Sequence, residues 1–169
     1  MDQKDEERRT LGFLLRDTSR LIRRLFVQCA RERGLPLNRS EASVLVHVER
    51  EQGMSQAQLA EQLDLEAISL VRLIDSLQEA GLIERRPHPH DRRIRTLWLT
   101  EAARPVLKQV MAVRRHVRAQ ALAGISTAEQ EKLFDLLVAV RGNLARQARR
   151  GSAGGMQDGE EGQPRSKVA

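Results

Sequence analysis

The 169-residue chain has few of the residues on which several protein classes depend. It contains one cysteine, one tryptophan, three phenylalanines and no tyrosine. A single cysteine excludes both a disulfide framework within the chain and a cysteine-rich zinc site. Proteins that bind RNA or single strands stack several unpaired bases on aromatic rings, and this chain has too few rings for that.

Long apolar runs and catalytic motifs are also missing. No run approaches the roughly 20 apolar residues that span a bilayer, and the start "MDQKDEERRT" lacks the apolar centre of a signal peptide. We therefore expect a cytoplasmic protein with no membrane partner. The sequence has no glycine-rich phosphate loop, no H-E-x-x-H and no nucleophile elbow, so we expect no enzyme and no cofactor. His88 and His90 lie among arginines without acidic neighbours at ligand spacing, so we expect no metal site.

Positive charge is what the chain has in excess. Its 29 lysines and arginines against 23 acidic residues give a net charge of +6 and an isoelectric point near 10.6. This balance favours an anionic partner such as nucleic acid. The stretch "ERRPHPHDRRIR", from Glu84 to Arg95, concentrates five arginines and two histidines in twelve residues.

Apolar spacing of three and four residues predicts six helices. One of them, over 11–33, has a stripe from Leu11 to Cys29 that is long for a small domain. Such a stripe needs a cover, which a second subunit can provide. The other predicted helices span 38–51, 55–63, 66–80, 101–123 and 127–149.

Local signals support these helix boundaries. Asn38 with Glu41, Ser55 with Gln58, and Ser126 with Glu129 have capping-box spacing. Thr100 is the expected cap of the helix that follows it. Asp64 is expected in a turn because Asp tolerates left-handed backbone better than most residues, and Gly81 suits a helix end.

After Gly81 the pattern changes to the alternation of β-strands. "LIERR" and "IRTLWL" read as two short strands joined by "PHPHDRR". The predicted fold class is mainly α: a winged helix-turn-helix of three helices plus a two-stranded β wing, with long N- and C-terminal dimerisation helices. The expected organisation is an N-terminal dimerisation helix (1–34), a winged DNA-binding lobe (35–100), C-terminal dimerisation helices (101–149) and a disordered tail (150–169).

The stretch from "LPLNRSEASVLVHV" to "LTEAARPVL" (35–107) resembles the MarR family of bacterial transcription regulators, and within it the SlyA-like branch. The resemblance rests mainly on "LVRLIDSLQEAGLIERR", the D-x-R of Asp91–Arg93 and the "LT" at 99–100. It implies a homodimer that binds double-stranded DNA at a pseudo-palindromic operator. It also implies a repressor that a small phenolic or aromatic carboxylate releases from DNA.

The helix over 66–80 carries little net charge, so its expected role is to read base edges. Ser69 can hydrogen-bond to a base or a phosphate. Arg72 can pair with guanine through two hydrogen bonds or hold a phosphate. Ala67, Ile68 and Val71 offer apolar contacts to a thymine methyl group.

The hairpin supplies the charge. The resemblance implies that Arg93 enters the minor groove, where negative potential attracts arginine. We expect the Asp91 carboxylate to hold the Arg93 side chain in one rotamer by a charge-assisted bond. Arg92 is expected to contact the DNA backbone. Arg86, with its neighbour Arg85, either contacts phosphate or is solvated.

An effector site is implied between the dimerisation helices and the DNA-binding lobe. Its candidate residues are Arg16 and Arg20 from the first helix, and Ala42, Val46 and His47 from the second. An arginine in such a cleft suits a carboxylate. The alternative is that both arginines are ordinary surface residues.

Other interpretations stay open. Cys29 is either a buried structural thiol or an oxidant sensor. The protein could be a winged-helix module that binds another protein instead of DNA, or an activator or anti-silencer without ligand control. The salt dependence of binding distinguishes a DNA-binding protein from the protein-binding module, because DNA binding weakens steeply as salt is added.

Overall fold

The computed structural model describes residues 10–91 and 93–154, with side chains up to residue 147. The chain divides after Ala121 into two compact units, residues 1–121 and 122–169. The predicted C-terminal segment 101–149 is therefore shared between them. None of the described helices is long and apolar enough to cross a membrane.

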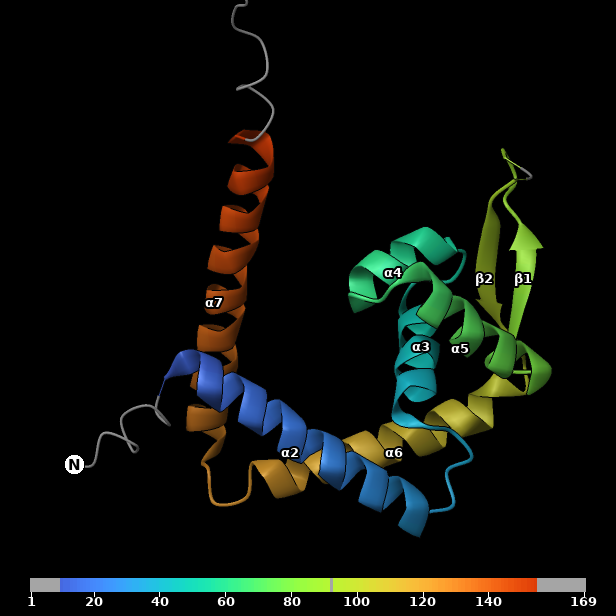
Figure 1. The fold of residues 1–169 in the computed structure, drawn as a ribbon. Coiled ribbons are helices and arrows are strands. Elements are labelled where there is room, and N and C mark those ends of the chain that lie inside the picture. Colours follow the sequence, from blue (N-terminus) through green and yellow to red (C-terminus); the bar gives the residue numbers. More distant parts are fainter. Residues whose placement is uncertain (1–9, 92, 155–169) are drawn as a thin grey trace, which may run out of the picture. The chain divides into compact units, whose positions relative to one another are not determined.

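The first unit is a set of helices from which an antiparallel hairpin projects (Figure 1). Helix α3 lies at its centre and contacts α2, α4, α5, α6 and β2. The strands pair from Ile83 opposite Leu99 to Pro87 opposite Arg95. This arrangement confirms the predicted mainly helical, winged helix-turn-helix fold class. In chain order the elements are α2 (Leu11–Glu32), α3 (Arg39–Arg50), α4 (Gln56–Leu63), α5 (Ala67–Glu79), β1 (Ile83–Pro87), β2 (Arg95–Leu99) and α6 (Ala103–Ala121).

The short helices begin and end where local chemistry predicts. The side chains of Asn38 and Ser55 each accept a hydrogen bond from the amide three residues ahead, and the side chains of Glu41 and Gln58 accept one from the backbone amide of the cap. Both capping boxes are thus confirmed. Asp64 has a φ of 51°, the left-handed conformation expected of it. These bonds satisfy amides that a helix start otherwise leaves unpaired, so they fix where each helix begins.

The core of this unit is aliphatic. Leu70, Ile74 and Leu77 of the predicted α5 stripe are buried, whereas Leu73 is half-buried. The opposite side of α5 is consequently presented to solvent. The other buried side chains with almost no exposure include Val44, Leu45, Val46, Val48, Leu59, Ile83, Leu97, Val110 and Val113.

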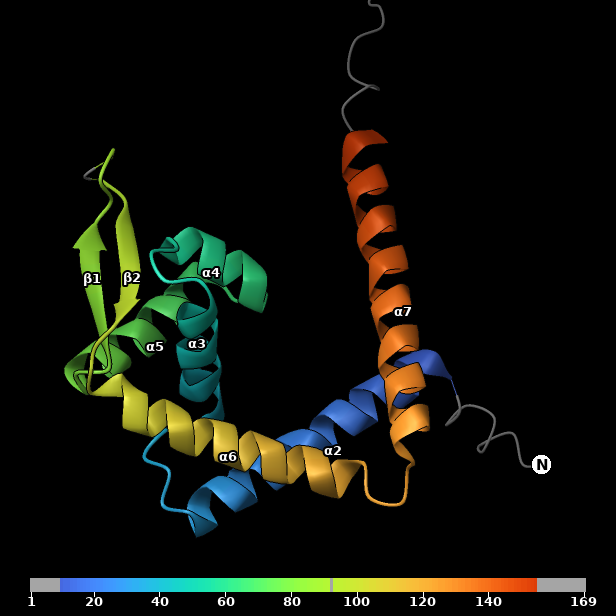
Figure 2. The ribbon, with the colours of Figure 1, turned by 180° about the vertical axis from the view of Figure 1, so that it is seen from behind.

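Helix α2 is buried only towards its end. Figure 2 shows it crossing α6, and Phe26, Cys29 and Ala30 are the residues it buries. Burial of Cys29 favours the structural thiol over the sensor, because an oxidant reaches an exposed thiolate more easily. The first part of the predicted stripe is not covered by the described residues. Leu11, Leu14, Leu15 and Ile22 are exposed there.

The two long C-terminal helices differ from their predicted boundaries. Helix α6 spans Ala103–Ala121 instead of 101–123. The Thr100 hydroxyl, expected to cap this helix, donates to the Gly81 carbonyl 2.6 Å away and joins the strand end to the turn after α5. Helix α7 spans Thr127–Gly154 and so extends past the expected end at 149 into the predicted tail. Residues 155–169, which make up the rest of that tail, lie outside the described residues.

The second unit contains α7. Its start is capped as predicted: the Ser126 amide donates to the Glu129 carboxylate over 3.0 Å, and the Glu129 amide donates back to the hydroxyl. The bonds from Ser126 lower the pKa of the Glu129 carboxyl. Most large apolar side chains of α7 are exposed: Leu133, Phe134, Leu136, Leu137, Val138 and Leu144.

Gly53, in the turn between α3 and α4, is a position where a side chain should be costly. Its φ is 88°, and a Cβ there would lie 3.0 Å from the Trp98 ring. We expect Gly53→Ala to lower the free energy of unfolding by about 1–3 kcal/mol, because the residue would be strained and the ring displaced. Urea titration at fixed protein concentration measures this.

Gly12→Ala is the matched control for this substitution. Gly12 lies in α2, and no atom from another part of the described chain lies within 4 Å of the place that a Cβ would take. Alanine in a helix is favoured over glycine by about 1 kcal/mol, so the control should lose no stability. Equal losses in both variants would contradict the role of the Trp98 contact.

Candidate nucleic-acid interface

Helix α5 presents the predicted reading residues together. Ala67, Ile68, Ser69, Val71 and Arg72 are all exposed, and Ile68 keeps 69% of its surface. An isoleucine so exposed at the start of a helix gains stability when a partner covers it. This face can therefore offer a hydroxyl, a guanidinium and apolar groups to one partner.

Helix α5 is oriented by a polar contact as well as by its buried apolar side chains. The Ser76 hydroxyl donates to the Glu41 carboxylate at the start of α3, over 2.8 Å. Sequence reasoning missed this bond because it joins residues 35 positions apart. It fixes the rotation of α5 and so the direction of its exposed face.

The loop of the hairpin is closed by backbone hydrogen bonds. The amide of His88 donates to the Ile94 carbonyl, and the amide of Ile94 donates to the Asp91 carbonyl, both over 3.0 Å. The Asp91 carboxylate accepts from the backbone amide of Arg93 over 2.9 Å. No ion pair between described residues joins it to the Arg93 guanidinium.

The expected contact of Asp91 is thus corrected. A carboxylate reaches the amide two residues ahead in a tight turn more readily than a long side chain that points outward. Asp91 fixes the backbone at Arg93 and leaves the exposed guanidinium of Arg93 available. Arg92, the other predicted contact, lies outside the described residues.

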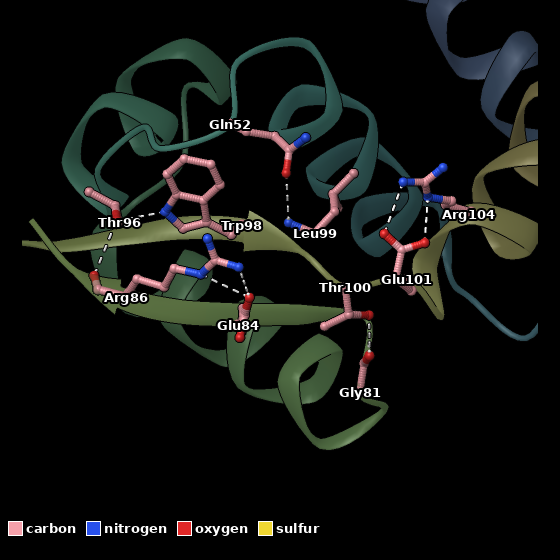
Figure 3. A network of polar contacts seen from close by, with 10 residues as sticks. All are labelled: Gln52, Gly81, Glu84, Arg86, Thr96, Trp98, Leu99, Thr100, Glu101 and Arg104. Carbon is pink, nitrogen blue, oxygen red and sulfur yellow. Dashed lines mark hydrogen bonds and ion pairs between the residues drawn. The ribbon is translucent and has the colours of Figure 1, made fainter.

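Arg86 is held on β1, near the loop-side end of the paired strands (Figure 3). Its guanidinium pairs with Glu84 and lies 4.7 Å from the centre of the Trp98 ring. The Trp98 indole donates to the Thr96 hydroxyl, which donates in turn to the Arg86 carbonyl. Arg86 is therefore neither simply solvated nor fully available to a phosphate.

Strand β2 is also tied to the turn between α3 and α4. The Gly53 amide donates to the Leu97 carbonyl, and the Leu97 amide donates to the Met54 carbonyl, both over 2.9 Å. The Gln52 side chain accepts from the Leu99 amide (Figure 3). The hairpin is consequently anchored to the helices at its base, and its loop extends beyond them.

Arg85, next to Arg86, binds α5. Its guanidinium pairs with Asp75 at 2.5 Å and donates to the Gln78 side chain at 2.7 Å. The guanidinium is therefore engaged within the protein and not simply solvated, and the phosphate contact stays a prediction. No sequence pattern signals this link, because the partners belong to different elements.

The five predicted effector residues do not form one site in the single chain. Ala42 and Val46 are 2% and 1% exposed and pack in the core, so in the single chain they offer little surface to a ligand. The His47 ring is held 2.8 Å from the Ser43 carbonyl. Arg20 pairs with Asp17, and Arg16 lies over Phe13, both on the exposed side of α2.

A basic groove on α2 was not predicted. It is open and has a volume of about 470 Å³. The groove is lined by Arg23, Arg24, Val27, Gln28, Arg31 and Glu32. Outside this lining, burial and, to a smaller extent, the charge of Arg23 lower the pKa of the Arg39 guanidinium.

In the described part of the chain, no three His, Cys, Asp or Glu side chains lie close enough together to hold a metal ion. The rings of His88 and His90 have centroids 5.9 Å apart and meet edge to face.

The helix α5 has an exposed face and lies beside a basic hairpin. This arrangement is that of the winged-helix DNA-binding regulators, which is the class of protein that the fold and the site define. The family model of the MarR family matches residues 34–94. A probable transcriptional regulator from Pseudomonas aeruginosa is 30% identical, with a TM-score of 0.68, over 78% of this chain and 97% of its own. The chain belongs to the MarR family, whose members are transcription regulators and not enzymes.

Two further solved structures are similar. The transcriptional regulator SlyA is 27% identical over 79% of this chain and 95% of its own, with a TM-score of 0.69. This is consistent with the SlyA-like branch. The transcriptional repressor CouR, solved bound to a 23-mer DNA duplex, is 22% identical over 83% of this chain and 99% of its own, with a TM-score of 0.73.

Proposed function

We propose that this protein is a cytoplasmic, homodimeric repressor that binds a pseudo-palindromic operator in double-stranded DNA. The observation that carries the proposal is the exposed face of α5 beside a hairpin whose loop presents Arg93. The structure of CouR bound to a DNA duplex supports it, since that repressor has a similar fold.

The two elements have different tasks on the duplex. Helix α5 enters the major groove, where Ser69 and Arg72 meet base edges and Ile68 and Val71 meet thymine methyl groups. The hairpin reaches the adjacent minor groove, where Arg93 is attracted by negative potential. Helix α5 thus reads the sequence, and the charge of the hairpin supplies affinity by releasing counterions.

The dimer follows from apolar surface that the single chain leaves exposed. Helix α7 and the first part of α2 carry leucines without a cover. A second copy can bury them, and two-fold symmetry then places the reading helices about 34 Å apart. The half-site centres should therefore lie about ten base pairs apart.

Selection from random duplexes tests the proposal. We expect the wild-type protein to enrich an inverted repeat with the spacing given above. The logarithm of its binding constant should fall linearly with the logarithm of salt concentration, with a slope of about −0.9 for each neutralised phosphate. Enrichment of no duplex, or binding insensitive to salt, would favour the protein-interaction module instead.

We also propose that a small aromatic carboxylate releases the repressor. Arg16 and Arg20 on the exposed side of α2 suit a carboxylate. Benzoate and hydroxybenzoates should raise the melting temperature of the wild-type protein and weaken its operator complex. An Arg16→Ala, Arg20→Ala variant should lose both responses. If it kept them, the ligand would bind elsewhere.

A further inference from the structure

Arg85 differs from the other described arginines of the hairpin, Arg86, Arg93 and Arg95, in having its guanidinium engaged with a helix. One terminal nitrogen pairs with Asp75 and the other donates to Gln78, both on α5. The side chain keeps 21% of its surface, against 52% for Arg86. A guanidinium used in this way has little left to offer a phosphate.

The Arg85–Asp75 pair is also unusual in what it connects. The other ion pairs found between residues 10 and 104 of the described chain do not join two elements of secondary structure. The others join residues no more than three positions apart. Because α5 and β1 are the elements that would enter neighbouring grooves, this pair lies between the two reading parts of the molecule.

Asp75 lies on the DNA-facing side of α5. It follows Val71 by four residues and Arg72 by three, the spacings that place side chains together on a helix. Without Arg85, its carboxylate would repel phosphates and compete for the Arg72 guanidinium. The pair therefore keeps Asp75 from interfering with the reading residue next to it.

We propose that Arg85 is a positioning residue, which fixes the wing against α5 through Asp75 and Gln78 so that both grooves are read together. The proposal rests on the proposed function of DNA recognition. Helix α5 is then held from two sides, since Ser76 bonds to Glu41 of α3 and Asp75 binds the wing.

The substitution Asp75→Asn gives opposite results under the two possible roles of the carboxylate. If Asp75 only repels DNA, removing its charge tightens binding. If it positions the wing, removing its charge weakens binding to the operator even though repulsion falls. The sign of the change therefore identifies the role.

The experiment titrates the duplex enriched by the wild-type protein, and an unrelated duplex, at fixed salt by fluorescence anisotropy. We expect Asp75→Asn to weaken operator binding by at least about fivefold, the lower end of the effect of one lost base contact. Binding to the unrelated duplex should be unchanged or tighter. Glu79→Gln, the same charge change on the same helix, should not weaken operator binding.

Arg85→Lys and a double variant complete the test. Lysine keeps the charge but cannot engage both partners in a planar fork, so it should weaken operator binding without changing the salt slope. The double variant Asp75→Asn, Arg85→Gln should lose no more operator affinity than the more damaging of the two single substitutions, because both substitutions break the same Arg85–Asp75 ion pair. Circular dichroism verifies each fold, and Arg85→Lys decides the question if another variant unfolds.

Two results would overturn the inference while leaving the proposed function intact: tighter or unchanged operator binding by Asp75→Asn, or a smaller salt slope in Arg85→Gln, which removes the charge. The second would identify Arg85 as a phosphate ligand. A wild-type protein that prefers no duplex would overturn the proposed function and the inference with it.

Discussion

Arg93→Ala should abolish operator binding under conditions in which the wild-type protein is saturated. Arg93 is exposed in the loop of the hairpin, and Asp91 fixes its backbone amide. Loss of a good groove contact costs about 1–3 kcal/mol. A two-fold dimer loses it twice, so the total is about 2–6 kcal/mol, a decrease in affinity of roughly 30-fold or more.

Arg86→Ala is the matched control, since it removes the same charge from the same hairpin. The Arg86 side chain is occupied by Glu84 and by the Trp98 ring, so its loss should affect DNA binding less. Gel-shift titrations of both variants on one operator at fixed salt compare them. If Arg86→Ala loses binding while Arg93→Ala binds like the wild type, the hairpin clamps phosphates and has no minor-groove reader.

Two further substitutions separate the roles of neighbouring residues. Asp91→Ala should resemble a weaker Arg93→Ala, because the guanidinium survives but the backbone that carries it loses a hydrogen bond. Arg72→Ala should relax the sequence preference at one position of each half-site if Arg72 reads guanine. Selection with each variant distinguishes weaker binding from altered preference.

The second large effect is expected at the exposed leucines of α7. Leu137 and Leu144 are exposed and seven residues apart, on one side of the helix. Leu137→Asp combined with Leu144→Asp should turn the dimer into a monomer, because burying two unpaired carboxylates in an apolar interface is strongly unfavourable. Sedimentation at micromolar concentration should fall from about twice 19.1 kDa to 19.1 kDa.

The affinity for the operator should fall when the dimer is converted into monomers. Two linked reading helices bind about 10²–10⁴-fold more tightly than one, and the monomer loses this advantage. Arg146→Glu is the control: it changes the net charge by the same two units and lies about 200° around the helix from Leu144. A wild-type monomer, or equal loss in the control, would contradict the proposed interface.

The helices and the hairpin could be predicted from the sequence because their signals are local. Spacing of apolar residues decides which face of a helix is buried, and capping residues act within one turn. The capping boxes at Asn38 and Ser55 and the left-handed Asp64 followed from residues no more than three positions away. The D-x-R pattern likewise placed Asp91 beside Arg93, although the carboxylate binds the amide.

Only the tertiary structure decided which side chains are available. Ala42 and Val46 were expected in a ligand cleft, but α3 is the central helix of its unit and both are covered. Arg85 and Arg86 are adjacent and chemically identical, yet one binds α5 and the other lies over Trp98. A sequence sets the charge of each residue, but a partner from another element depends on how the elements pack, and no spacing along the chain encodes that.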